Sequence, residues 1–358
     1  MNGKKFVESH FHKYLTEHLN AEIALNTIQN FDIAMNWIRS TFFYVRAVRN
    51  PSSKYELQPR MDKDLIDRKI EEMCLRQIKE LQKNGLVILN GMNLQTTVYG
   101  KLMSKYYLSF ETMKLFRQIK GSETYLETIN TIVKCKEFSD FVIRANEKGI
   151  LNQLNGSPIR FPIRGRIRSN EDKISCLIQA VFGNLTLPTP ALIQESIKII
   201  RIGDRLSKCL LEYLRLRQSN DSKFRCYKAL LNALTIVKCF HAKLWENSEF
   251  ASKQIRKIGA VHSSLLVNAG KTTIKSISET DARTIESILN LSAPFGNELL
   301  LNIMITYPTY LLDISLKSEN VIQVHLKQLN EEYIYIGSHT VLIVGDSLNN
   351  LLLYEENV

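Results

Sequence analysis

A long amphipathic helical pattern from residue 190 to 217 constrains the fold of this chain more than any other feature of its sequence. Apolar side chains recur within it at three- and four-residue spacing, as on one face of an α-helix. We expect these residues to face a core: Leu192, Ile193, Ile197, Ile200, Leu206, Leu210 and Leu214. Because the pattern is almost wholly helical from about residue 116 to 306, the sequence predicts a mainly α fold with a helical bundle.

The first 115 residues predict a winged-helix domain. Asp32 is a candidate N-cap for an amphipathic helix that continues to Pro51, and Asp62 is a candidate N-cap for a second helix. The apolar run 86–89 then leads into Asn90-Gly91, a strong short signal for a β-hairpin. Helices followed by a small hairpin describe a winged helix; a small helical domain with an accidental turn is the alternative.

After about Tyr307 the hydrophobic period changes from that of a helix to that of a strand. Four short strands are predicted, at 310–316, 321–326, 340–344 and 351–354. An immunoglobulin-like sandwich has about seven strands, so this segment is expected to be an incomplete β-domain. The predicted domains are therefore a winged helix at 1–115, a helical domain at 116–306 and a partial β-sandwich at 307–358.

The chain carries 47 Lys and Arg residues against 36 Asp and Glu residues, a formal net charge of +11. Such an excess favours polyanionic partners, because each cation placed on a phosphate releases condensed counterions. A solvated basic surface without a partner is the alternative. The placement of the cations along the chain is therefore more informative than their number.

Four cations are spaced three, four and three residues apart, on one stripe of the long helix: Lys198, Arg201, Arg205 and Lys208. Glu212 interrupts the basic series before Arg215 and Arg217. Like charges on one helix face repel one another unless an anion lies along them, and a phosphate backbone is such an anion. The stripe predicts a phosphate-contacting surface, with a solvated basic face as an equal alternative.

A second basic cluster lies in the irregular connector 156–170, which also contains Arg160. Arginine forks suit bidentate phosphate contacts. Alternation would place three arginines on one side of an extended segment: Arg164, Arg166 and Arg168. Pairing with Glu171 and Asp172 is the alternative.

The segment 269–273 resembles the end of a phosphate-binding P-loop, but Leu265 stands where that motif requires its first glycine. A P-loop also follows a strand, whereas residues 261–268 have a helical pattern, so we reject a nucleotide site here. The same residues fit a helix-hairpin-helix at about 252–291, whose turn would present backbone N–H groups to phosphate. The predicted contacts are Gly270, Lys271 and Thr272; a plain packing unit is the alternative.

Motifs of catalytic and metal sites are absent from the sequence, which contains no GxSxG, HExxH or GxGxxG pattern. The six cysteines form no CxxC pair, so we interpret them as reduced core residues of a nuclear or cytosolic protein. Trp245 is interpreted as a core anchor between helices. No run of about 18 apolar residues and no secretory signal occurs, so neither a membrane span nor a membrane partner is expected.

Several long blocks of the chain resemble a known family in order and content. Three resemble the winged-helix linker of the Ski-two-like helicases: TEHLNAEIAL (16–25), NWIRSTFFYVRAVRNP (36–51) and YGKLMSKYYLSFETMKLF (99–116). Five others resemble the Sec-sixty-three-type helical domain: CKEFSDFVIRANEKGILNQLN (135–155), CFHAKLWENS (239–248), SKQIRKIGAVHSSLLVNAG (252–270), ETDAR (279–283) and PFG (294–296). The likeness covers residues 8–320 and is strongest to the Mer-three family of meiotic crossover DNA helicases.

This resemblance implies an ATP-driven enzyme that moves three-prime to five-prime on DNA and acts on recombination intermediates in meiosis. In the family, two RecA-like motor lobes hold ATP and Mg²⁺, and their motifs are missing here, so we expect a fragment or a motor supplied elsewhere. By resemblance, residues 190–217 match the ratchet helix that lies along the translocating strand, and the C-terminal strands match the start of a fibronectin-like domain.

The sequence therefore predicts a non-catalytic, nuclear module that grips single-stranded or branched DNA. Its expected partners are RecA-like motor lobes of the same helicase and recombination proteins, and it holds no cofactor of its own. The alternative is a protein-interaction scaffold, or an accessory module of an RNA helicase of the Brr-two splicing type.

Overall fold

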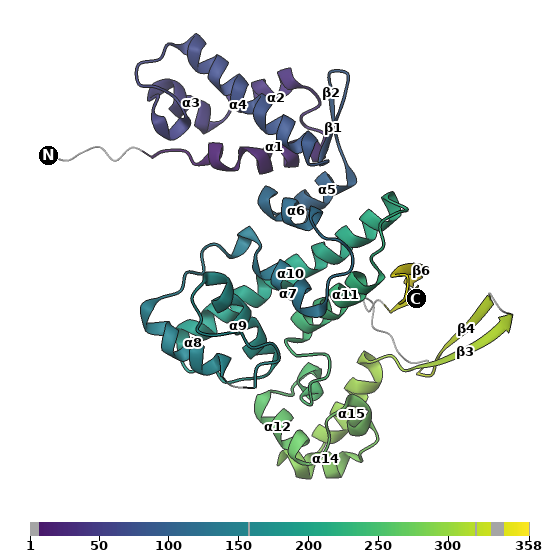
Figure 1. Ribbon diagram of the computed structural model, residues 1–358. Helices are drawn as coiled ribbons and strands as arrows, with labels where there is room; N and C mark the ends of the chain where they lie inside the picture. The colour runs from purple at the N-terminus through teal and green to yellow at the C-terminus, as the bar shows by residue number, and fades with distance from the viewer. Residues whose placement is uncertain (1–6, 157, 319–320, 331–339, 358) are drawn as a thin grey trace.

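The computed structural model describes residues 7–156, 158–318, 321–330 and 340–357. Figure 1 shows a winged helix at the top, a helical bundle in the middle and a smaller group of helices at the bottom. The fold is mainly α, as predicted. None of the described helices is both long enough and apolar enough to cross a membrane.

The N-terminal region consists of short helices around one long helix, followed by a hairpin. Its elements are η1 Phe11–Tyr14, α1 Leu15–Ala24, α2 Phe31–Arg39, α3 Phe42–Arg49, η2 Ser53–Tyr55, α4 Lys63–Lys83, β1 Val87–Asn90, β2 Asn93–Thr96, α5 Val98–Lys105 and α6 Phe110–Arg117. Asp62 caps α4 as predicted, since its side chain accepts a hydrogen bond from the Leu65 N–H at 2.8 Å. The predicted hairpin forms, and Gly91 takes a positive φ of 61° in its turn.

The single helix predicted from Asp32 to Pro51 is wrong in two respects. Asn30, not Asp32, caps α2, because its side chain accepts from the Ile33 N–H at 2.9 Å. The helix then stops at Ser40, and Thr41 starts α3 by accepting a hydrogen bond from the Tyr44 N–H. Hydroxyl side chains compete with the backbone for hydrogen bonds and so favour a helix end at this point.

The bundle is built around one helix of 31 residues, α10 Pro190–Asn220, which Thr189 caps. Its other elements are α7 Tyr125–Val133, η3 Lys136–Phe138, η4 Ala145–Glu147, α8 Lys148–Asn155, α9 Asn170–Phe182 and α11 Tyr227–Ala242. Of the apolar residues predicted to face the core, five are buried, but Ile193 and Ile197 are 42% and 49% exposed. The apolar stripe is therefore narrower at the start of α10 than the spacing predicts.

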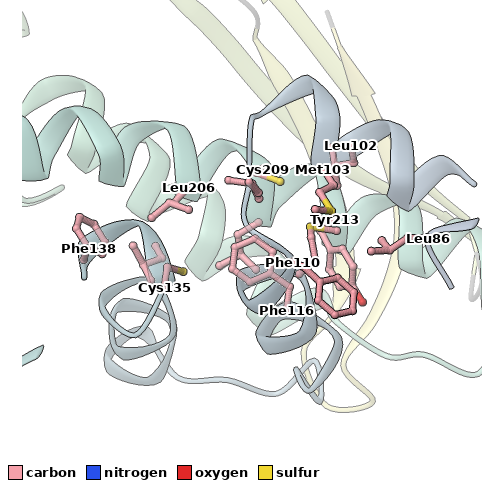
Figure 2. Packing of buried hydrophobic residues seen from close by; sticks show 14 of the residues in the cluster. Leu86, Leu102, Met103, Phe110, Phe116, Cys135, Phe138, Leu206, Cys209 and Tyr213 are labelled. Atoms are coloured by element: carbon pink, nitrogen blue, oxygen red, sulfur yellow. The ribbon is translucent and has the colours of Figure 1, made fainter. Parts of the chain in front are cut away.

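The winged helix and the bundle share one continuous hydrophobic core. Figure 2 shows Met103 and Phe110 of the first region close to Cys209 and Tyr213 of α10. Farther along the chain, α10 and α11 approach closely at Gly203, where an added Cβ would lie 2.1 Å from a ring carbon of Phe240. The backbone of α10 is thus held against the winged helix at one end and against α11 near its middle.

The start of α10 is held by a network of four charged side chains, of which Lys173 is fully buried and Arg144 is exposed. The Lys173 ammonium, 0% exposed, lies 2.7 Å from a carboxylate oxygen of Glu147 and 2.7 Å from one of Glu195 on α10. Arg144 pairs with the same two carboxylates at 3.2 Å and 2.6 Å. The network joins η4, α9 and α10, because each cation bridges both acids.

A smaller helical group follows, with its own core of buried Ile and Leu side chains. It contains η5 Ala251–Gln254, α12 Ala260–Asn268, α13 Ile274–Ser278, α14 Ala282–Leu289 and α15 Phe295–Thr306. Helices α12 and α13 are joined by a turn at Gly270, as the predicted helix-hairpin-helix requires.

The C-terminal strands are β3 Tyr310–Ser318, β4 Val321–Gln328, β5 Val341–Asp346 and β6 Leu351–Asn357, close to the four predicted. In the described residues they form two separate antiparallel hairpins, β3–β4 and β5–β6, rather than two packed sheets. The β3–β4 hairpin projects away from the bundle in Figure 1 and exposes several apolar side chains.

The β5–β6 hairpin instead packs on the bundle. The Asn350 side chain donates to the carbonyl oxygens of Gly121 and Arg225, both at 3.0 Å, and accepts from the Lys228 N–H at 2.7 Å. Ile343 also packs against the main core.

Candidate nucleic-acid interface

The predicted basic stripe on α10 is only partly open to a ligand. Lys198 and Arg201 are exposed, and neither has an ion pair among the described residues. Lys208 is paired with Asp204, with 2.7 Å between its ammonium and the carboxylate. The Arg205 Nε is buried and has no hydrogen-bond partner within the described part of the chain.

Asp204 is the residue that sequence reasoning missed on this helix. It lies four residues before Lys208, so one helical turn brings the two side chains together. The spacing of the cations alone did not take this acid into account. The four-cation row is therefore reduced to two freely exposed members, Lys198 and Arg201.

Two hollows lie along the line where α10 packs against α11, and His241 lines both. The first has a volume of about 310 Å³ and is lined by Arg201 and Lys243 among others. The second has a volume of about 940 Å³ and is lined by Lys208 and Lys238 among others. We call these two hollows together the α10–α11 groove.

The α10–α11 groove has two sides, which we call its banks. Helix α10 forms the first bank, and α11 with its C-cap residue Lys243 forms the second. Lys238, His241 and Lys243 are exposed there, and none of the three has an ion pair in the described structure. Lys243 lines the first hollow together with Arg201 of α10, Lys238 lines the second, and His241 lines both. Their spacing of three and two residues in the sequence was an available signal that the prediction did not use.

Lys253 shows that positive charge is uncompensated near this bank. Its ammonium is half-buried against the Asn184 side chain, to whose oxygen it donates at 2.7 Å. Burial lowers the pKa of Lys253 below its ordinary value, and the positive charge of Lys243 lowers that pKa further. Neither Lys253 nor Lys243 has an ion pair with an acid among the described residues.

Acids at the edge of the groove are already paired. Glu246 binds Arg160 at 2.7 Å, and Glu355 of β6 binds Arg215. Arg160 is also stacked over the rings of Tyr125, Phe161 and Trp245, with 4.9, 5.3 and 5.1 Å from its guanidinium carbon to the ring centroids. Arg160 is thus a packing residue, and Trp245, 9% exposed, is the core anchor that the sequence predicts.

The three other connector arginines are exposed: Arg164, Arg166 and Arg168. None forms an ion pair with Glu171 or Asp172 in the described residues. Asp172 instead accepts hydrogen bonds from the backbone N–H groups of Arg168 and Ser169, both at 2.9 Å. The prediction of a regularly extended segment is wrong at Gly165, which has a φ of +81°. These arginines do not line either hollow of the groove.

Gly270, Lys271 and Thr272 also lie apart from the groove, in the turn between α12 and α13. Gly270 has a φ of +76°, and the Lys271 N–H donates to the Leu266 carbonyl at 2.8 Å to close the end of α12. The segment before this turn is helical, as the rejection of a P-loop assumed. Phosphate contact by these three residues stays a prediction.

Comparison with known protein families decides the identity of the fold. Residues 96–358 match the model of the Sec63 Brl domain, which is most of the chain. The chain belongs to the Sec63 Brl domain family. Residues 8–91 match a winged helix-turn-helix domain model, which confirms the predicted winged helix.

Both banks of the α10–α11 groove lie within the Sec63 Brl match. The same match begins before α5 and α6, which the sequence assigned to the winged helix. The boundary at residue 115 thus stays a prediction.

Relatives of this Sec63 Brl protein include named DNA helicases. The chain is 41% identical over 99% of its length to the Probable ATP-dependent DNA helicase HFM1 of Xenopus tropicalis, and 42% identical over 97% to that of Homo sapiens. It is 27% identical over 96% of its length to the ATP-dependent DNA helicase MER3 of Saccharomyces cerevisiae. These similarities confirm the resemblance to the Mer-three helicases. The chain spans 25–30% of the length of these relatives.

Proposed function

We propose that this chain is a strand-gripping module of a DNA helicase that acts in meiotic recombination, and that the α10–α11 groove holds the backbone of one DNA strand. The names of the relatives support the helicase and its DNA substrate. The observation that carries the role of the groove is the set of unpaired cations on its two banks, Arg201 on α10 and Lys238 and Lys243 on α11.

The shape and chemistry of the groove fit a single strand. Phosphates bind cations without regard to sequence, and apolar or aromatic side chains accept the faces of unstacked bases. In the first hollow, the exposed side chain of Ile197 belongs to the same lining as the cations Arg201 and Lys243. The exposed side chain of Ile197, which the core does not use, gains a role as part of this lining.

The wider setting follows from the same proposal. RecA-like motor lobes that bind ATP and Mg²⁺ would drive movement three-prime to five-prime, and the winged helix would support them. Recombination proteins and branched DNA are the further partners, and the nucleus is the place of action. The arginines of the connector and the turn at Gly270 would be secondary phosphate contacts outside the groove.

Equilibrium binding of a labelled single-stranded DNA tests this function. We expect Arg201→Ala, Lys238→Ala and Lys243→Ala each to weaken binding about three- to tenfold, because each removes one phosphate contact. Lys79→Ala is the matched control, since Lys79 is an exposed lysine of α4 away from the groove. Equal losses in the control and the groove variants would contradict the assignment.

The same assay separates the alternatives. Single-stranded RNA bound more tightly than DNA would favour an accessory module of an RNA helicase. No measurable binding of either strand at low salt would favour a protein-interaction scaffold.

A further inference from the structure

A third hollow lies between the winged helix and the segment that leads into the bundle. It has a volume of about 540 Å³ and is lined by residues of α1, of the end of α5 and of the segment around η3. Asn20 fixes the two helices beneath it, because its amide donates to the Gly100 carbonyl and to the Ser104 hydroxyl, both at 2.9 Å. We call it the α1–α5 groove.

Two tyrosines stand exposed at the edge of this groove. Tyr14 is 57% exposed and Tyr107 is 82% exposed, although both line the hollow. Tyr107 also has a φ of +50°, a conformation that non-glycine residues rarely take. The Leu108 N–H donates to the Met103 carbonyl at 3.0 Å and so helps to hold the turn. An exposed aromatic ring on such a turn is suited to contact a cation or an apolar side chain.

Acidic groups predominate in the lining of this groove. Glu17, Glu137 and Asp140 line it with one lysine, Lys136. The Phe110 N–H donates to Glu17 at 2.9 Å and the Ser109 N–H donates to Glu137 at 2.8 Å, so both carboxylates have fixed positions. Asp140 is exposed and has no ion pair in the described part of the chain.

This local charge is opposite to that of the whole chain, whose formal net charge is +11. An acidic hollow repels phosphate and attracts cations, so a nucleic acid is disfavoured here. A basic protein segment fits both the acidic groups and the exposed tyrosines of the groove. Its Arg or Lys head groups would pair with the carboxylates, and the apolar stems of these side chains would pack on the tyrosine rings.

We propose that the α1–α5 groove docks a basic segment of a partner protein, with an Arg or Lys side chain between the ring of Tyr107 and the carboxylates of Glu17 and Asp140. This site does not depend on the proposed grip on DNA, because the two grooves share no lining residue.

Binding of two labelled ten-residue peptides to the full chain tests the proposal, one of alternating Arg and Leu and one of alternating Glu and Leu. We expect the Arg peptide to bind and the Glu peptide not to bind. Asp140→Lys should lower the affinity for the Arg peptide about tenfold by charge repulsion. Tyr107→Ser should lower it about threefold by loss of the cation–π contact.

Asp313→Lys is the matched control, because it makes the same charge change at an exposed position of β3. Asp313→Lys should change the affinity for the Arg peptide by no more than about twofold, because salt largely screens a charge that lies far from the groove. Full affinity in Asp140→Lys, or an equal loss in the control, would overturn the proposal. So would weaker single-stranded DNA binding in Tyr107→Ser with unchanged peptide binding, since the hollow would then be a nucleic-acid surface.

Discussion

Single residues decide whether the cations of this chain are available. Asp204 binds Lys208, and Glu355 binds Arg215, so two members of the basic series on α10 are neutralised by neighbours. Asp204 lies within the row, but spacing arguments that count only cations overlook it. Glu355 lies 140 residues away along the chain, and nothing in the local pattern indicates that contact.

Lys173 tests the charge network at the start of α10. Lys173→Met keeps most of the side-chain volume but leaves Glu147 and Glu195 without their shared buried cation. We expect the free energy of unfolding to fall by about 3 kcal/mol, as when one partner of a buried ion pair is removed. Urea unfolding measures this, with exposed Lys148→Met as the control. A loss no greater than that of the control would contradict the network's role.

The same network predicts a pH dependence. Burial is the largest single influence on the pKa of Glu147 and raises it, but the hydrogen bonds from Lys173 and from the Arg144 N–H, with the charges of both residues, together outweigh burial. The pKa of Glu147 is therefore lower in the folded protein than its ordinary value. A lowered pKa stabilises the fold above the ordinary glutamate value of about 4.3, and this stability is lost as pH falls through the folded value. The difference in unfolding free energy between wild type and Lys173→Met should therefore shrink from pH 7 to pH 3. A difference that stays constant would count against it.

The absence of a nucleotide site at the turn that contains Lys271 can be tested directly. Because α12 precedes the turn and the first glycine of the motif is absent, we expect the isolated chain to release no phosphate from ATP with Mg²⁺. A phosphate-release assay measures this. Magnesium-dependent turnover that Lys271→Ala abolishes would show a nucleotide site after all.

At the scale of elements, periodicity predicted most of the fold. The long helix α10, the hairpin after α4 and all four C-terminal strands lie where their patterns indicate. The break between α2 and α3 was missed because the apolar stripe continues across it, while the hydroxyls of Ser40 and Thr41 end the helix. The α11 bank was missed because the prediction did not use the close spacing of Lys238, His241 and Lys243, and because the spacing alone does not show that α10 and α11 pack together.

Gly203 tests that packing. Gly203→Ala places a methyl group against Phe240, whose ring must move, so α10 and α11 should separate slightly. We expect a loss of about 1–3 kcal/mol in unfolding free energy, the usual cost of overpacking, together with weaker binding of single-stranded DNA. Gly149→Ala in α8 is the control, because nothing lies within 4 Å of an added Cβ there. Equal stability in the two variants would contradict the close approach.

At the scale of the whole molecule, three parts of the chain meet at α10. The winged helix shares its core, α11 forms the groove beside it, and Glu355 of the β5–β6 hairpin pairs with Arg215 near its C-terminal end. Sequence patterns could predict each of these parts, but they could not predict that all three pack on α10. That packing depends on contacts between residues far apart in the chain.

The hairpin's attachment can be tested at Asn350, whose side chain makes three hydrogen bonds to the backbone of the bundle. Asn350→Ala removes all three, so we expect faster amide hydrogen exchange in β5 and β6 and unchanged exchange in α4. Asn349→Ala is the control, since the Asn349 side chain bonds only to Asp346 in the same turn. Protection in β5 and β6 that survives in Asn350→Ala would show that other contacts hold the hairpin.

The central claim is that the cations on both banks of the α10–α11 groove contact phosphates. The dependence of single-stranded DNA affinity on salt concentration tests it most directly, because its slope counts the contacts. In the combined variant Arg201→Ala, Lys238→Ala and Lys243→Ala, the slope of log affinity against log salt should be shallower by about 2, at about 0.7 per lost contact. An unchanged slope would show that DNA, if bound at all, lies elsewhere on the protein.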